Sequence, residues 1–150
     1  MRVAFYTPHM CLRGTTVALF DYAKYNEILL GNESFIFTDK EHDFHDQSVF
    51  EKFRTQFPGK IVRVDNEESL DPAIIDHKID AIYIIKPGRI SKRMASACKT
   101  LIHVIGPTDP SEKHGDVWAY ASHWLNNNCA KGAEPVVPYM IEPPVDTETN

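Results

Sequence analysis

Cysteine, excess positive charge and long apolar runs are all scarce in this chain. Its 150 residues include three cysteines, and 16 lysines and arginines stand against 21 aspartates and glutamates. Cys11, Cys98 and Cys129 are odd in number and form no Cys-x-x-Cys pair, so the sequence indicates neither a disulfide framework nor a thiolate zinc site. The net charge of −5 argues against nonspecific binding to nucleic acid or anionic membranes, because both need a concentrated positive field.

The amino-terminal apolar run, residues 2–7, is much shorter than a signal-peptide core or a membrane span. Together with the sparse cysteines, this run predicts a cytoplasmic protein without a membrane span. The histidines and carboxylates of residues 39–46 match no closed metal-ligand spacing, so no metal site is predicted. We expect no cofactor and no nucleic-acid partner.

What the sequence does contain is an alternation of apolar strands and helical patterns. Strands are predicted at residues 2–7, 34–38, 60–64, 81–85, 100–105, 117–121 and 135–138. Helices are predicted at residues 16–30, around Phe50, Phe53 and Phe57, at residues 70–77, from Ser91 to Lys99 and at residues 122–128. Strands separated by helices imply right-handed crossovers. The predicted fold class is therefore α/β, a single-domain, doubly wound, mainly parallel Rossmann-like sheet with helices on both faces.

The domain is expected to span residues 1–141. Residues 142–150 combine proline with acidic residues and show no periodicity, so they are predicted to form a polar tail or linker. In the first helix, the apolar period predicts a buried stripe made of Ala18, Tyr22, Tyr25 and Leu29. The opposite, charged side is predicted to carry Asp21, Lys24 and Glu27.

Ligands of such a sheet bind beyond the carboxyl ends of its strands, so the loop after the first strand is the first candidate site. Gly14 permits close backbone approach, and Thr15 and Thr16 can cap the following helix, whose N–H groups and dipole favour an anion. The loop matches neither the Gly-x-Gly-x-x-Gly fingerprint nor a P-loop. Two interpretations of this loop stay open. It contacts a ligand through Arg13, Gly14, Thr15 and Thr16, or it is an ordinary turn.

The fourth strand ends at the same predicted edge with Lys86, followed by Gly88 and Arg89. Two cations at this edge are suited to a phosphate or carboxylate, and arginine can bind either one in bidentate fashion. A turn with solvated charges is the alternative. These three residues are kept as ligand-binding candidates.

The loop at residues 106–115 is long and polar, as binding loops tend to be. Its Asp109 and His114 are weak candidates for catalytic acid and base, and a plain surface loop is the favoured alternative. His103 lies within the fifth predicted strand, where a hydrogen-bonded core imidazole is expected.

Several phrases resemble the amino-terminal domain of GT-B glycosyltransferases. The segment "MRVAFYTPHMCLRGTTVALFDYAKYNEILLG" is similar to that family's first strand, glycine-bearing loop and long first helix. The segments "GDVWAYASHWLNN" and "EPVVPYMIEPP" resemble its late helix and its exit toward the interdomain linker. By this resemblance, Arg13, Gly14 and Thr15 fall on the glycine-bearing loop, and Ser122 falls on the serine that opens the late helix.

The chain departs from the family pattern at two places. Many members have a histidine just after the fifth strand, where this chain has Gly106 or Pro107, and many pair two glycines where this chain has Arg13 and Gly14. A catalytic role by analogy is therefore not assigned. Gly106 and Ser122 are kept as ligand-binding candidates.

The resemblance implies an acceptor-binding half of an enzyme that transfers a sugar from a nucleotide-sugar donor to a sugar or glycan acceptor. It would be hexosyltransferase-like once completed by a separate carboxyl-terminal, donor-binding half. A second hypothesis is a stand-alone module, possible as a homodimer, that binds a nucleotide, sugar phosphate or other small anion without catalysis. A third is a small enzyme that uses Asp109 and His114.

Overall fold

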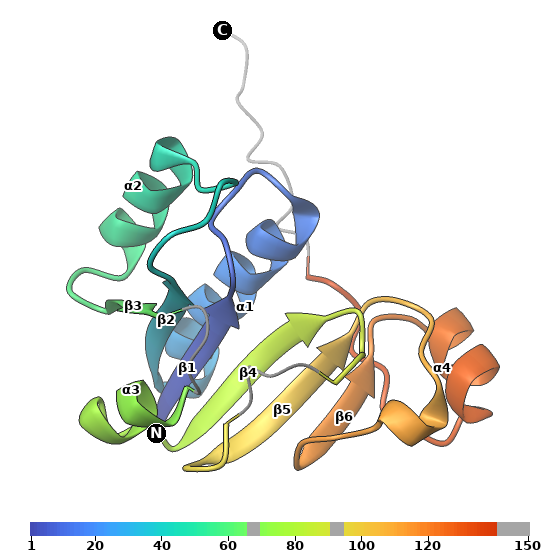
Figure 1. The fold of residues 1–150 in the computed structure, drawn as a ribbon. Helices are drawn as coiled ribbons and strands as arrows, with labels where there is room; N and C mark the ends of the chain where they lie inside the picture. The colour runs from blue at the N-terminus through green and yellow to red at the C-terminus, as the bar shows by residue number, and fades with distance from the viewer. Residues whose placement is uncertain (66–69, 91–94, 141–150) are drawn as a thin grey trace, which may run out of the picture.

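Six parallel strands form one sheet in the order β3-β2-β1-β4-β5-β6 (Figure 1). The computed structural model describes residues 1–65, 70–90 and 95–140. The strands are β1 (Arg2–Thr7), β2 (Glu33–Asp39), β3 (Ile61–Val64), β4 (Ala81–Lys86), β5 (Lys99–Val104) and β6 (Val117–Tyr120). Strand order reverses between β1 and β4, as in a doubly wound Rossmann-like fold. The predicted fold class is confirmed: a single α/β domain with a parallel sheet.

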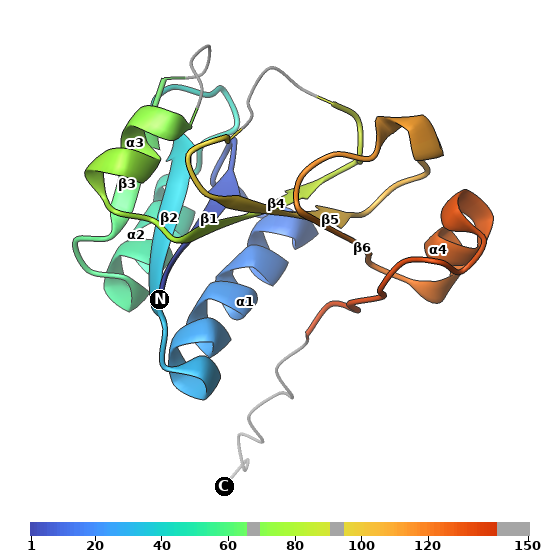
Figure 2. The same cartoon turned by 90° about the horizontal axis from the view of Figure 1, so that it is seen from below.

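Helices pack on both faces of this sheet. They are α1 (Gly14–Leu30), α2 (Gln47–Gln56), α3 (Asp71–Asp76) and α4 (His123–Ala130). Residues of α1 and α2 share one apolar cluster with Val3 and Phe5 of β1, whereas residues of α3 and α4 share a second cluster with Ala4 and Tyr6. Figure 2 shows α1 and α3 on opposite sides of the sheet. Because β1 is covered on both faces, its residues are apolar almost throughout.

The first helix differs from its prediction. It begins at Gly14 rather than residue 16, and its buried residues include Leu19, Ala23 and Asn26, whereas Leu29 is 70% exposed. Asn26 donates a hydrogen bond to Ser34 Oγ, which in turn donates to the Ala23 carbonyl, so polar bonds fix this side of α1 against β2. Apolar residues occur nearly all round the helix, so their period alone could not define the buried side.

The predicted helix from Ser91 to Lys99 is wrong over its described part. Residues 91–94 lie outside the described residues, residues 95–98 are not helical and Lys99 begins β5. The Asp71 carboxylate accepts bonds from the amides of Ser96 and Ala97, which holds this segment in a turn.

The last predicted strand is reduced to one parallel bridge between Tyr120 and Val136. Pro135 and Pro138 flank this bridge and have no N–H to extend a ladder. The predicted tail, residues 142–150, lies outside the described residues. Within the part of the chain that the structure describes, no helix is both long and apolar enough to cross a membrane.

Candidate functional site

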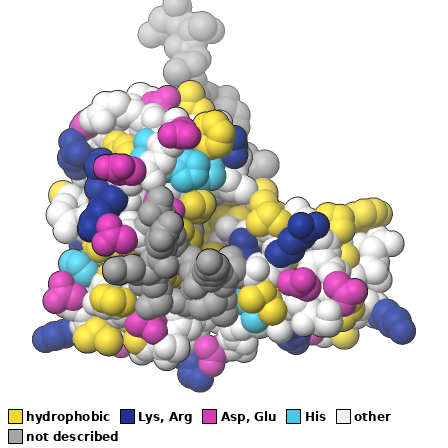
Figure 3. Space-filling model, viewed as in Figure 1, with side chains coloured by type: hydrophobic (Ala, Val, Ile, Leu, Met, Phe, Trp, Pro, Cys, Tyr) yellow, Lys and Arg dark blue, Asp and Glu magenta, His cyan; other side chains and the backbone are white. Residues whose placement is uncertain are grey.

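A cavity of about 1010 Å³ lies beyond the carboxyl ends of β1 and β4, at the point where strand order reverses. Figure 3 shows a hollow here between the surface over α2 and the surface over α4, with hydrophobic side chains on its floor. The apolar lining comes from Leu19, Ile84, Ile85, Ile90, Ile105 and Leu125. Ligands of doubly wound sheets bind at this edge, so the cavity is the candidate site.

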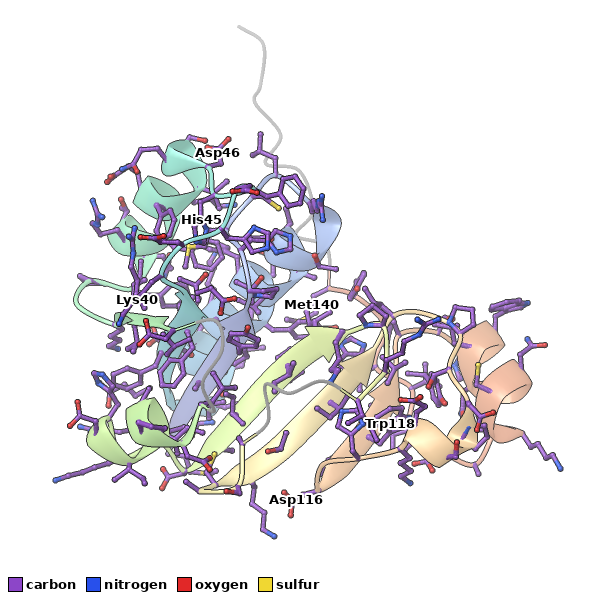
Figure 4. All side chains as sticks on the ribbon, in the orientation of Figure 1. Lys40, His45, Asp46, Asp116, Trp118 and Met140 are labelled. Atoms are coloured by element: carbon purple, nitrogen blue, oxygen red, sulfur yellow. The ribbon has the colours of Figure 1, made fainter. Side chains whose placement is uncertain are left out.

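The loop after β1 is braced by the segment between β2 and α2. Met10 is fully buried, its amide donates to His45 Nδ1 at 3.1 Å, and its carbonyl accepts from the Asp46 amide at 2.8 Å. Figure 4 shows His45 and Asp46 together on that segment. Asp46 also caps α2 by accepting from the Ser48 amide. These bonds position His9 and Arg13 at the cavity wall.

The amino end of α1 lies at the cavity. Gly14 and Thr15, both predicted as ligand contacts, line the cavity, and no described side chain caps the helix at Arg13. Because the helix begins at Gly14, the predicted capping by Thr15 or Thr16 is wrong. An uncapped helix start presents backbone N–H groups and a partial positive charge. Thr16 is 2% exposed, lies 3.8 Å from Cys11 Sγ and does not line the cavity.

Lys86, at the end of β4, is half-buried and lines the cavity, as does the exposed Arg89. Lys86 Nζ lies 2.9 Å from His114 Nε2. Burial lowers the pKa of Lys86, and the nearby Glu112 carboxylate opposes that shift. Gly88 does not line the cavity. It has φ +106°, and a Cβ there would lie 2.9 Å from Thr108 Cβ, so this glycine allows the two loops to approach closely.

The two catalytic candidates on the loop after β5 have separate hydrogen-bond partners. Asp109 is exposed, caps a short 3₁₀ helix (Pro110–Glu112) and accepts from Ser111, whose bonds lower the pKa of Asp109. His114 bonds to the Glu112 carbonyl through Nδ1 at 2.6 Å. The described bonds of Asp109 and His114 thus go to different partners. Gly106 lies beside Pro87 and is not among the cavity residues.

Ser122 lines the cavity and caps α4, its Oγ accepting from the Leu125 amide at 3.2 Å. The cavity residues that sequence reasoning missed include Tyr6, His9 and Tyr139. The position of His9 in the loop after the first strand was a usable signal for it, because that loop lies at the ligand edge of such a sheet. Tyr139 follows the last bridge and no local pattern marks it.

Two of the missed residues have defined surroundings. The Tyr6 hydroxyl donates to Asp39 Oδ1 at 3.0 Å. Burial lowers the pKa of His9, and the neighbouring His42, Arg13 and His45 lower it further, while Asp39 opposes them. His9 therefore favours its neutral form beside the cavity.

Among the described residues that line the cavity, Arg13, Lys86 and Arg89 carry positive charge and none is acidic. The chain as a whole has more acidic than basic residues, so this cation-only lining departs from its average surface. Within the described ranges, no group of three histidine, cysteine or acidic side chains is arranged to hold a metal ion. The site is suited to an anionic group.

His103 lies away from the cavity, in the sheet. It is 1% exposed and hydrogen-bonds through Nδ1 to the Tyr83 hydroxyl, which confirms the predicted core position. Its Nε2 is buried without a hydrogen-bond partner among the described residues, so the imidazole is satisfied on one side only.

Fold and cavity together define a single-domain Rossmann-like protein with a cation-lined site at the topological switch point. In comparisons with known proteins, no family model matches this chain, and no curated protein or solved structure matches it significantly.

Proposed function

We propose that the chain binds a small phosphate-bearing ligand, of the nucleotide-sugar or sugar-phosphate class, in the cavity at the carboxyl edge of β1 and β4. The observation that carries this proposal is the charge of the lining: three cations and no described acidic residue in a protein of net charge −5. The uncapped start of α1 adds backbone donors. The apolar wall suits the non-ionic part of such a ligand.

A thermal-shift panel tests this proposal. It contains nucleotide sugars, nucleoside diphosphates, sugar phosphates and inorganic pyrophosphate, each far above its expected Kd. A ligand at about 100 times its Kd adds about 2.7 kcal/mol of stability. Arg13→Gln and Arg89→Gln should each weaken binding about tenfold or more, because a charge-assisted hydrogen bond contributes about 1.5–3 kcal/mol.

Lys131→Gln is the matched control, because Lys131 is exposed and does not line the cavity. It should bind like the wild type. The proposal fails if no panel member stabilises the protein, or if the two arginine variants bind as tightly as the control.

As the specific form of this function, we propose the acceptor-side half of a GT-B glycosyltransferase. Its support is the resemblance of the sequence phrases and the position of the cavity at the switch point. Transfer needs groups from both halves around the donor phosphate, so the chain alone should bind a nucleotide sugar without turning it over. Multiple turnovers of a nucleotide sugar by the isolated chain would contradict this half-enzyme proposal.

The stand-alone binding module is a second candidate, favoured by the way residues 136–140 pack against the domain. The Tyr22 hydroxyl donates to the Pro138 carbonyl at 2.6 Å, the Val137 amide donates to the Tyr120 carbonyl, and Tyr139 packs on His103. Met140 lies against the same side of the sheet (Figure 4). Strong hydrogen-exchange protection of the Val137 amide would support a self-contained domain, and exchange at the free-peptide rate would count against it.

A further inference from the structure

One half-buried amine in the cavity wall has a base beside it. Lys86 extends from the last position of β4, lines the cavity and has its Nζ 2.9 Å from His114 Nε2. The His114 ring is fixed from two further sides. Its Nδ1 lies 2.6 Å from the Glu112 carbonyl, and the ring packs edge-on against Trp118 with centroids 5.2 Å apart.

These contacts define the tautomer of His114. A carbonyl oxygen only accepts hydrogen bonds, so Nδ1 carries the ring proton and donates it to Glu112. Nε2 then carries a lone pair, and Lys86 Nζ donates to it. The imidazole is thus a proton acceptor aimed at the lysine amine.

Burial makes the neutral form of the Lys86 amine easier to reach than that of a solvent-exposed lysine. Ile84, Ile85 and Ile105 line the same cavity, and burial among apolar groups penalises an ammonium ion. Burial lowers the pKa of Lys86 more strongly than the Glu112 carboxylate raises it. A neutral lysine amine is a nucleophile for carbonyl carbon.

We infer that Lys86 forms an imine with an anionic aldehyde or ketone that enters this cavity, with His114 as the proton shuttle. This activity goes beyond the proposed reversible binding of phosphate-bearing ligands. Arg13 and Arg89 would hold the anionic group of the carbonyl compound and keep its carbonyl carbon near Nζ.

The reaction balances without a redox partner. The Nζ lone pair attacks the carbonyl carbon, the C=O π pair moves to oxygen, and that oxygen takes a proton from solvent. Nζ releases a proton to His114 Nε2, which returns it to the hydroxyl group as the C–O bond breaks and water leaves. Nζ loses its second hydrogen to solvent while the C=N bond forms, so one amine and one carbonyl give one imine and one water.

Reductive trapping tests the inference. The folded protein is incubated with pyridoxal 5′-phosphate, an aldehyde that carries a phosphate, and with sodium cyanoborohydride, which reduces only the imine formed. Peptide mapping by mass spectrometry then gives the labelling rate of each lysine. Lys86 should label several-fold faster than the exposed Lys131 in the same sample, because burial lowers the pKa of Lys86 and so raises its neutral fraction.

Three variants or probes sharpen the result. Lys86→Arg keeps the charge, removes the amine and should abolish the fast label while the slow labels remain. His114→Gln should slow labelling of Lys86 several-fold and flatten its pH dependence, a change that a merely structural role would not produce. Pyridoxal without the phosphate should lose most of the preference for Lys86.

The inference is overturned if Lys86 labels no faster than Lys131. It is also overturned if the Lys86→Arg variant still takes up the fast label, because that label must then be on another lysine. Pyrophosphate binding by the wild-type chain, measured separately by calorimetry, reports on the proposed function. If pyrophosphate binds but Lys86 is not selectively labelled, the proposed reversible binding stands and imine formation is rejected. If Lys86 is selectively labelled but pyrophosphate does not bind, imine formation stands and the proposed reversible binding of phosphate-bearing ligands is rejected.

Discussion

The two halves of the sheet are built differently. In the amino half, residues 1–64, the strands are joined by helices of 17 and 10 residues, α1 and α2. In the carboxyl half, residues 81–140, the described connections between β4, β5 and β6 contain a 3₁₀ helix of three residues. The cavity lies where the halves meet. The start of α1 forms one wall, and the loops after β4 and β5 form the other together with the start of α4.

The two halves also differ in the contacts that stabilise them and in where their candidate binding residues lie. The amino half is held by aromatic packing, with Phe20 against Phe53 at 5.0 Å and against Phe57 at 5.7 Å between ring centroids. The carboxyl half also has buried apolar packing, around Trp118 and Tyr120, and polar bonds join its loops, such as the Asp116 carboxylate accepting from the Thr100 amide at 2.9 Å. Loops on a rigid frame are the usual carriers of binding residues.

The largest expected effect is the loss of aromatic packing in the amino half. Phe53 is 1% exposed, so Phe53→Ala removes a fully buried ring and should lower the free energy of unfolding by about 3–5 kcal/mol. Leu125→Ala in the carboxyl half should cost about 2 kcal/mol, at the low end for a buried leucine, because Leu125 borders the existing cavity. Urea unfolding measures both values.

Phe44→Ala is the control for the phenylalanine variant, because that ring is 54% exposed. It should change the unfolding free energy by less than about 0.5 kcal/mol. If Leu125→Ala lowers the free energy of unfolding as much as Phe53→Ala does, the expected contrast between the two halves is contradicted.

Glycine substitutions probe how the loops of the carboxyl half are held. Gly88 has φ +106°, and an added Cβ would lie within 3.0 Å of Thr108 and Val104 side-chain atoms. Gly88→Ala should cost about 1–3 kcal/mol from overpacking in addition to backbone strain. It should also weaken pyrophosphate binding, since the loop that carries Arg89 must move.

Gly59 in the amino half is the matched control. Its φ is +73°, but an added Cβ would meet nothing within 4 Å. Gly59→Ala should therefore cost about 1 kcal/mol, the strain of a left-handed residue alone, and leave binding unchanged. Equal losses of stability in the two variants would show that loop contact at Gly88 contributes nothing.

Sequence reasoning succeeds where the signal is local. Each described strand of the sheet is predicted to within one or two residues, because a parallel strand covered on both faces is a continuous apolar run. The switch-point rule then places the loops after β1 and β4 beside one another, and the structure brings Arg13, Lys86 and Arg89 to one cavity. The rule needs only the order of elements.

Sequence reasoning fails where the partner is distant or the pattern is degenerate. Lys86 and His114 are 28 residues apart, and neither the strand nor the polar loop indicates their contact. The predicted α1 stripe holds at Ala18, which is buried, but fails at Leu29, which is exposed, and the predicted charged side fails at Asp21, which is buried. Apolar residues surround that helix, so their period alone does not define the buried side, and the Asn26–Ser34 bond helps to fix it. Tyr139 reaches the cavity through a segment whose path depends on contacts with Tyr22 and His103.

The smallest expected effect is a pH dependence that also differs between the halves. Burial lowers the pKa of His103 on β5, and the Val137 carbonyl opposes that shift. Burial and neighbouring cations lower the pKa of His9 in the loop after β1. Both histidines take up a proton more readily in the unfolded chain. Their contribution to stability is complete above a pH of about 6.5 and declines as pH falls toward the lowered pKa of the folded state.

Urea unfolding at about pH 7.5 and about pH 5 measures this loss, in a window above the range where carboxylates such as Asp46 and Asp116 titrate. His103→Gln should remove more of the pH dependence than His9→Gln, because His103 is 1% exposed whereas His9 borders the open cavity. The comparison uses the difference between the two pH values, so a general loss of stability in either variant cancels. Wild-type stability that stays constant or rises on acidification would contradict the lowered pKa values, and an equal effect of both substitutions would contradict the difference between the halves.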